Sequence, residues 1–231
     1  MKKTLICLMT LFSLAAMTTS ALAGNPLLPV VNDFVSQRAT EFDQIPESRK
    51  QELAAVAAYV SKQHLAGKPA KLTFICTHNS RRSHLSQIWA TVAASYYQIG
   101  DVETYSGGTE ATAFNPRAVA AIKRAGMQVK QEGNPANPHY LVSYQTSGDS
   151  LTCFSKVYND PSNPQKEFCA VMTCQNANEA CPIVQGSNSR IAVAYEDPKV
   201  ADNTPEETTR YDERSAQICR EMLYLFSLVK R

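Results

Sequence analysis

The chain has 231 residues, enough for one domain with its own core and a short additional segment. Hydrophobic residues make up 44% and charged residues 19%, a globular composition that excludes a disordered or collagen-like chain. Lys and Arg number 23 against 21 Asp and Glu, and this near-neutral balance argues against a general nucleic-acid or membrane-surface binder. After residue 25 no apolar run approaches 18 residues, so we expect no membrane-spanning helix there.

The first 23 residues have the pattern of a cleavable secretory signal. Lys2 and Lys3 precede an apolar stretch over residues 5–16, and residues 21–23 read Ala-Leu-Ala, a small-residue cleavage site. A membrane anchor or a terminal helix is the alternative interpretation. We expect cleavage after Ala23 and an exported, periplasmic protein that has no membrane contact once the signal is removed.

Residues 24–70 are expected to form an N-terminal helical arm. Residues 25–43 carry prolines and mixed polarity, which is typical of an irregular lead-in segment. Residues 46–66 begin with Pro, are rich in Ala, Leu, Glu, Lys and Gln, and are followed by Gly67. This pattern predicts one amphipathic helix of about five turns.

The remaining residues, 71–231, alternate strand-like and helix-like segments. Apolar runs predict buried strands over residues 71–76, 102–106, 168–173 and 190–195. Helices are predicted over residues 83–99, 116–125 and 206–230. The order strand–helix–strand–helix–strand–strand–helix predicts an α/β fold with a four-stranded parallel sheet flanked by helices.

One stretch, residues 134–165, interrupts that alternation. It is dense in Pro, Asn, Ser and Gly and contains two strand-like pieces, residues 140–144 and 151–158. This composition predicts an inserted β-hairpin with loops.

A Cys-x5-Arg-Ser motif lies between the first strand and its helix. Its residues are Cys76, Thr77, His78, Asn79, Ser80, Arg81, Arg82 and Ser83. A loop in this position points backbone N–H groups inward at the positive end of a helix dipole, which makes a cradle for a tetrahedral oxyanion. The same field favours the thiolate of Cys76, a nucleophile. The alternative is a buried strand-end cysteine before a basic helix start.

Two side chains at the end of this motif suit the same chemistry. The planar guanidinium of Arg82 can curl back and bind two oxyanion oxygens. The hydroxyl of Ser83 can donate to the Cys76 sulfur when that sulfur becomes a leaving group. The motif therefore predicts an anion-binding thiol site.

The motif resembles the phosphate loop of the low-molecular-weight protein tyrosine phosphatases and of the thioredoxin-coupled arsenate reductases that share their fold. Residues 105–108 are similar to the family's Ser-Ala-Gly stretch, residues 115–118 to its Asn-Pro-x-Ala helix start, and residues 197–198 to its Asp-Pro acid loop. Residues 174–182 resemble the Cys-x6-Cys-Pro segment of the reductases. The resemblance covers about residues 71–231, and it departs from the family at His78, where Gly is usual. The arm and the insert have no counterpart in the small family members.

The resemblance implies the low-molecular-weight phosphatase fold and a set of catalytic residues. By this resemblance, Cys76 attacks an oxyanion held by the loop and Arg82, and Asp197 protonates the leaving oxygen. For a reductase, it implies that Cys174 attacks next, that Cys181 resolves, and that a thioredoxin-like dithiol reduces the resulting pair. It implies no cofactor, and no cysteine or histidine spacing matches a zinc site.

Two features favour an arsenate reductase over a phosphatase. A phosphatase has no need of the Cys-x6-Cys-Pro segment, and phosphatases commonly carry aromatic residues after Asp-Pro, whereas Lys199 and Val200 follow here. The oxidising periplasm argues against an arsenate reductase, because turnover there needs an exported reductant. A phosphatase acting on phosphotyrosine or small phosphoesters through a cysteinyl phosphate is the alternative function, and a non-catalytic oxyanion or redox sensor is the third.

Six cysteines follow the signal, and an even number in an exported chain is typical of a disulfide framework. Cys153 and Cys169 bracket the insert and are candidates for a structural disulfide. Cys219 is expected in the core on the last helix. For Cys174 and Cys181, a static disulfide is the alternative to a redox pair.

Overall fold

A four-stranded parallel sheet lies at the centre of the computed structural model, which describes residues 27–148 and 150–230. The expected signal over residues 1–23 lies outside these residues. The strands are β1 (Ala70–Cys76), β2 (Val102–Gly108), β6 (Phe168–Met172) and β7 (Ser187–Ala192), in the spatial order β2-β1-β6-β7. The predicted α/β fold is confirmed, with β7 three residues earlier in the chain than expected.

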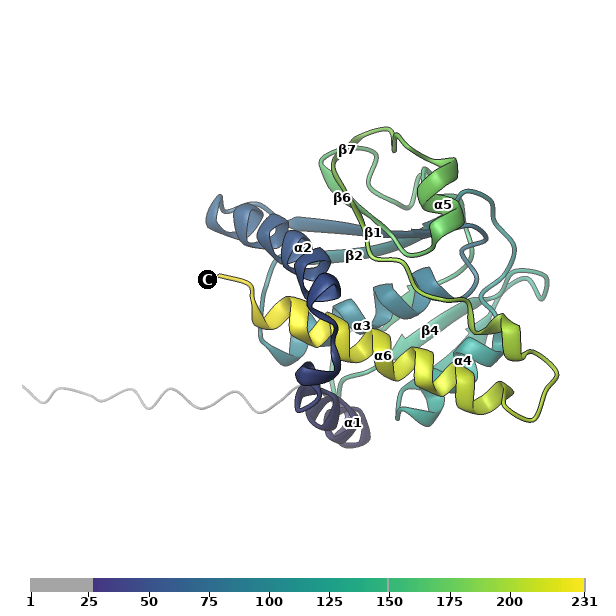
Figure 1. Cartoon of the computed structure of the whole chain (residues 1–231). Helices are drawn as coiled ribbons and strands as arrows, with labels where there is room; N and C mark the ends of the chain where they lie inside the picture. The colour runs from purple at the N-terminus through teal and green to yellow at the C-terminus, as the bar shows by residue number, and fades with distance from the viewer. Residues whose placement is uncertain (1–26, 149, 231) are drawn as a thin grey trace, which may run out of the picture.

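The two faces of this sheet belong to two different cores, because successive side chains of a strand point to opposite sides. Leu72, Phe74 and Val171 face the main core, whereas Ile75 and Ala170 face a smaller apolar cluster. Helices α3 (Arg82–Tyr96) and α6 (Glu207–Ser227) lie on the first side, and the short helix α5 (Gln175–Ala180) lies on the other (Figure 1). The small cluster therefore sits between the sheet and α5.

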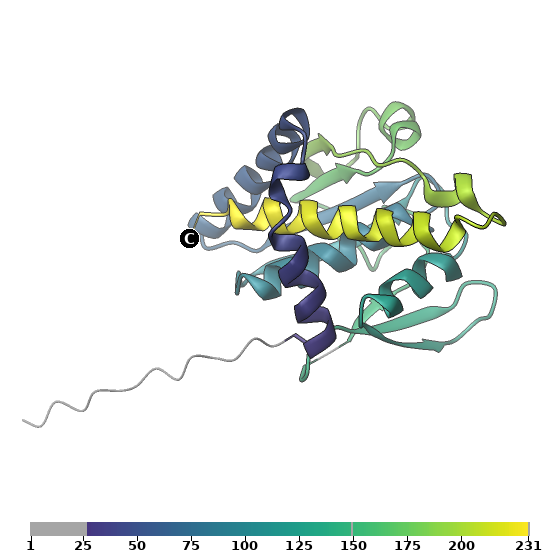
Figure 2. The same ribbon diagram turned by 60° about the horizontal axis from the view of Figure 1, so that its bottom comes forward.

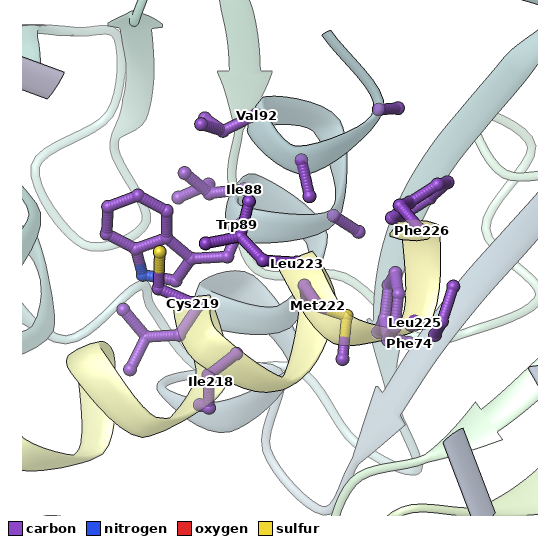
Figure 3. Close-up of a cluster of buried hydrophobic side chains, with 14 of the residues drawn as sticks. Phe74, Ile88, Trp89, Val92, Ile218, Cys219, Met222, Leu223, Leu225 and Phe226 are labelled. Carbon is purple, nitrogen blue, oxygen red and sulfur yellow. The ribbon is translucent and has the colours of Figure 1, made fainter. Parts of the chain in front are cut away.

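Helices α3 and α6 pack together in the main core. Figure 3 shows Phe74 of β1, Trp89 of α3, and Cys219 and Leu223 of α6 gathered in this layer, and all four are buried. Trp89 satisfies its indole nitrogen by donating to Ser215 Oγ at 2.9 Å. Cys219 is a core thiol, as predicted.

The N-terminal arm has two α-helices instead of the expected one. Helix α1 (Pro29–Ala39), a 3-10 turn (Phe42–Gln44) and α2 (Glu47–Leu65) follow one another, and α1 and α2 both pack on α6 (Figure 2). The prediction of an irregular lead-in over residues 25–43 is wrong: Val31 and Val35, one helical turn apart, are buried against the core. The helix predicted over residues 46–66 is confirmed.

The β-hairpin predicted for the insert is confirmed, and one further strand extends it to a three-stranded antiparallel sheet. Strands β3 (Gln128–Glu132), β4 (His139–Ser143) and β5 (Leu151–Cys153) pair in chain order, after helix α4 (Pro116–Arg124). The sheet thus begins before residue 134, because the polar and largely exposed β3 forms by pairing with β4.

The proposed disulfide between Cys153 and Cys169 is not formed. Cys153 lies in β5 of the inserted sheet and Cys169 in β6 of the central sheet, and both are free, buried thiols. Burial raises the pKa of each thiol to about 12. Among residues 27–148 and 150–230, no helix has the length and apolar character needed to cross a membrane.

Candidate active site

The strand order singles out the carboxyl ends of β1 and β6 as the expected ligand-binding position. The chain leaves β1 for β2 on one side and later returns to β6 on the other side of β1, which is the arrangement where open α/β sheets bind ligands. Cys76 is the last residue of β1, and Cys174 follows the end of β6 by two residues. The intervening Thr173 donates its backbone N–H to Ile75 O at 2.7 Å, so the two strands stay paired up to the residues before the two thiols. Both predicted thiols therefore lie at the same sheet edge.

Residues 76–83, here named the anion loop, carry the first thiol. Cys76 Sγ lies 3.1 Å from Ser83 Oγ, and Asn79 Nδ2 donates to that same oxygen at 2.8 Å. Because Asn79 supplies a hydrogen to Ser83 Oγ, the hydroxyl proton of Ser83 is free to point at the sulfur. Helix α3 begins at Arg82, so its positive end faces the loop.

The end of β2 supports the anion loop through backbone contacts. Thr77 O accepts from Glu110 N at 2.9 Å and from Thr109 Oγ1 at 3.1 Å. Gly108 permits this approach: a Cβ atom there would lie 2.2 Å from Glu110 O and 2.7 Å from both Asn79 N and Thr77 O. No residue larger than glycine fits at this position without moving the loop.

The insert supports the loop from another direction. Ser155 Oγ donates to His78 O at 3.0 Å, and Lys156 N donates to Asn79 Oδ1 at 2.8 Å. These bonds hold Asn79 in a left-handed conformation, with φ of 44°. Asn137 fixes Ser155 in turn through two hydrogen bonds to its backbone, at 2.8 and 3.1 Å. The sequence predicted the insert but gave no signal for this contact.

Arg82, the seventh residue of the anion loop, contacts Asp197. Arg82 Nη2 donates to Asp197 Oδ2 at 2.9 Å, and Nη1 donates to Tyr195 O at 3.0 Å. Within the described residues, the buried Nε of Arg82 has no hydrogen-bond partner, so this donor remains for another acceptor. Asp197 also accepts from Lys199 N at 3.1 Å and begins a 3-10 turn, Pro198–Ala201.

The side chains of two other loop residues are engaged outside the loop. Arg81 Nε donates to Tyr211 Oη at 2.9 Å, and its guanidinium lies 3.6 Å from Asp202. His78 Nε2 lies 2.8 Å from Glu110 Oε1 in a partly exposed pair. Of the predicted oxyanion-binding residues, Arg81 and His78 can therefore contribute their backbone N–H groups, while Ser80 bonds Ala113 O through its hydroxyl.

The second thiol lies against the anion loop. Cys174 Sγ is 3.4 Å from Thr77 Oγ1 and accepts from Ala177 N at 3.4 Å as the N-cap of α5. Cys181 is the C-cap of the same helix and is partly exposed. Residues 174–181, here named the redox segment, thus carry one thiol at each end of a short helix that the sequence did not predict.

The N-terminal arm also reaches the site, through a residue that the sequence did not single out. Arg49 of α2 donates to Ala194 O, and its guanidinium lies 5.2 Å from the ring centre of Tyr195. Tyr195 is buried, and this burial raises its pKa well above the ordinary value. Because Tyr195 O accepts from Arg82, Arg49 braces the backbone that leads to Asp197.

Beneath the loop, His84 of α3 is a structural residue. Its Nδ1 lies 3.1 Å from Ser106 Oγ, and its ring stacks on Phe114 at 4.1 Å. Burial, together with the nearby charge of Lys156, lowers its pKa well below the ordinary value, which keeps the ring neutral. No group of three His, Cys, Asp or Glu side chains in the described part of the chain is arranged to hold a metal ion.

Comparison with known proteins gives this geometry a family. The chain is 31% identical to the arsenate reductase of Halalkalibacterium halodurans over 134 residues, which are 58% of this chain and 78% of that protein. It is similar to the structure of a low molecular weight phosphotyrosine phosphatase from Vibrio cholerae (TM-score 0.47, 11% identity, 68% and 95% of the two chains). It is also similar to that of a thioredoxin-dependent arsenate reductase from Corynebacterium glutamicum (TM-score 0.37, 15% identity, 82% and 92%). No protein-family model matches. On the strength of its alignment with the H. halodurans protein, the chain belongs to the arsenate reductase family.

Proposed function

We propose that this thiol enzyme reduces arsenate with Cys76, Cys174 and Cys181 acting in turn. The observation that carries the proposal is the position of Cys174. Its sulfur lies 3.4 Å from Oγ1 of Thr77, the residue that directly follows the nucleophile Cys76. A second thiol at the anion loop, with a third at the far end of a short helix, serves thiol–disulfide exchange and has no part in hydrolysis.

In the first step, the Cys76 thiolate attacks the arsenic atom of arsenate bound in the anion loop. Backbone N–H groups of the loop and the guanidinium of Arg82 hold the oxyanion, and Asp197 donates the proton with which one oxygen leaves as water. The free Nε of Arg82 and its contact with Asp197 support these roles. The product is a cysteinyl arsenate that still contains As(V).

The next two steps move electrons from sulfur to arsenic. The Cys174 thiolate attacks Cys76 Sγ, the S–As bond breaks with its electron pair on arsenic, and arsenite leaves while a Cys76–Cys174 disulfide forms. The Cys181 thiolate then attacks Cys174 Sγ, which releases the Cys76 thiolate and leaves a Cys174–Cys181 disulfide. A thioredoxin-like dithiol reduces this disulfide and completes the cycle.

Hydrolysis of phosphate esters is the second candidate, because the anion loop, Arg82 and Asp197 suffice for it. The turn after Asp197 argues against phosphotyrosine as the substrate. It presents Lys199 and the exposed Val200 where an aromatic side chain would be needed to hold a phenyl ring.

The test compares two substrates on the same variants. Cys174→Ser and Cys181→Ser should each abolish multiple-turnover arsenate reduction by a thioredoxin system. Hydrolysis of an aryl phosphate should stay within about threefold of wild type, because it needs only the anion loop with Cys76, Arg82 and Asp197. Cys181→Ser should also trap a Cys76–Cys174 disulfide after arsenate is added, which peptide mass mapping detects.

The control is Cys153→Ala, which removes a buried thiol outside the site. It should retain both activities. Arsenate turnover that survives Cys174→Ser would overturn the reductase, and inert arsenate beside hydrolysed phosphotyrosine would favour the phosphatase. Loss of both activities in the two serine variants, with a Cys174–Cys181 disulfide present before substrate is added, would show a structural disulfide.

We propose that the protein acts in the periplasm after cleavage following Ala23, on the basis of the signal pattern in residues 1–23. N-terminal sequencing of the protein from a periplasmic extract should begin at Gly24. A full-length chain retained in the cytoplasm would contradict this localisation.

A further inference from the structure

The redox segment has few attachments to the rest of the molecule. Of the six residues of α5, only Ala177 is buried, in the small cluster on the far face of the sheet. Helix α5 is too short to be stable by itself in water. Its wound form therefore depends on contacts made by other segments.

One arginine makes most of the polar contacts at the end of this helix. Arg190 lies on the edge strand β7, in register with Ala170, whose side chain faces the α5 side of the sheet. Arg190 Nε donates to Cys181 O at 3.0 Å, and Nη2 donates to Asn178 O and to Asn178 Oδ1, the latter at 2.8 Å. Carbonyl groups in the last turn of a helix lack partners within the helix, so this guanidinium takes the place of the missing donors.

The wound helix is incompatible with a disulfide between its two ends. Cys174 and Cys181 are seven positions apart, and an α-helix rises ~1.5 Å per residue, so their Cα atoms lie about 10 Å apart along the axis. A disulfide requires about 6 Å between Cα atoms. Bringing the two sulfurs together therefore unwinds α5, and Asn178 and Cys181 then cannot both keep their hydrogen bonds to Arg190.

We propose that Arg190 is a positioning residue that holds the redox segment in its wound, dithiol form and so sets the reduction potential of the Cys174–Cys181 pair. The inference rests on the proposed function, since it takes these two cysteines to be the redox pair. A contact present in the dithiol form and absent from the disulfide form stabilises the reduced protein. Such stabilisation raises the potential and makes the disulfide easier for an external dithiol to reduce.

The experiment measures the thiol–disulfide equilibrium without arsenate. The protein carries Cys76→Ser, so that Cys174 can pair only with Cys181 at the site, and is equilibrated in glutathione redox buffers, acid-quenched, alkylated and mapped by mass spectrometry. Arg190→Ala should shift the equilibrium about tenfold toward the disulfide, which corresponds to a potential ~30 mV more negative.

Three further variants separate the causes. Arg190→Lys keeps the positive charge and loses the planar guanidinium. It should therefore shift the equilibrium toward the disulfide by most of the amount expected for Arg190→Ala. Asn178→Ala removes one of the three acceptors and should shift about threefold in the same direction, which keeps the test decisive if Arg190→Ala folds poorly. Arg124→Ala, which breaks an ion pair with Asp212 on another part of the surface, should leave the equilibrium unchanged.

The outcomes distinguish this inference from the proposed function. Suppose that the Cys174–Cys181 disulfide forms and that the equilibrium of Arg190→Ala, or that of Arg190→Lys, equals the wild-type equilibrium. The role of Arg190 as a planar, multiple donor is then overturned, while the reductase proposal stands. A shift of the equilibrium toward the dithiol form in Arg190→Ala would also overturn the proposed role of Arg190. If no Cys174–Cys181 disulfide forms in any variant, the proposed function and this inference fail together.

Discussion

The anion loop and the redox segment lie against each other at one edge of the sheet, yet the rest of the chain holds them in different ways. The anion loop receives hydrogen bonds from the end of β2, from the insert and from its own Asn79, and Gly108 packs directly on its backbone. The redox segment is attached through the buried side chains of Cys174 and Ala177, the contact of Cys174 with Thr77 and the side chain of Arg190.

This difference matches what the proposed steps demand of each region. Binding a tetrahedral oxyanion requires donors that are already in place, because reorienting them during the reaction costs free energy. Passing a disulfide from Cys76 to Cys181 requires one segment that changes shape. Damage to the anion loop should therefore affect both substrates, and damage to the redox segment should affect arsenate reduction alone.

The largest effect is expected at the nucleophile and its guanidinium partner. Cys76→Ser and Arg82→Ala should each lower both arsenate reduction and aryl phosphate hydrolysis by at least about 1,000-fold, because one removes the attacking sulfur and the other the donors for the developing charge. Steady-state assays, with circular dichroism to verify folding, measure this. Substantial turnover of either substrate by folded Cys76→Ser would exclude the proposed site.

Asp197→Asn should separate substrates by their leaving group. The amide cannot supply a proton, so turnover of substrates with poor leaving groups should fall by ~100- to 10,000-fold, while activated aryl phosphates lose little. A series of aryl phosphates of graded phenol pKa measures the dependence. An equal loss across the series would mean that Asp197 serves only to hold Arg82.

A smaller loss is expected when the support of the anion loop is disturbed from behind. Gly108→Ala introduces a Cβ atom 2.2 Å from Glu110 O, so the loop must move, and we expect both activities to fall by about 10- to 100-fold. Gly100→Ala is the matched control, since a Cβ atom there has no neighbour within 4 Å. If Gly108→Ala lost arsenate reduction alone, the anion loop would not be the rigid partner in this comparison.

The smallest effect concerns the N-terminal arm. Arg49→Met removes the donor to Ala194 O and the cation above Tyr195, and this should lower kcat about fivefold for poor leaving groups with little change in KM. Lys50→Ala on the same helix, whose amine pairs with Glu47, is the control. A uniform loss across leaving groups would indicate that Arg49 contributes only to stability.

Some of this arrangement could be predicted from sequence because it is encoded locally. A buried strand followed by Cys76, a polar turn and Arg82 at a helix start is read directly from neighbouring residues. The order of strands and helices likewise gave the parallel sheet. The roles of Cys174, Cys181 and Asp197 came only through the family resemblance, and the structure brings Cys174 and Asp197 to the loop.

The parts that were not predicted depend on contacts between distant segments. Strand β3 is polar and forms through its pairing with β4, so it shows no apolar alternation. Helix α5 contains two asparagines, poor helix formers, and is held by Arg190 from another strand. The valine pair of α1, Val31 and Val35, was a usable signal that the prolines and polar residues around it obscured.

Three thiols that take no part in the proposed chemistry give the protein a built-in reporter of its own unfolding. Cys153, Cys169 and Cys219 are buried in the main core, and burial raises the pKa of Cys219 well above its ordinary value, as it does for the other two. A thiol reagent at neutral pH reaches their sulfur atoms only when the surrounding core opens. Their alkylation in native buffer, followed over hours by mass spectrometry, therefore measures the free energy of that opening without denaturant and without an activity assay.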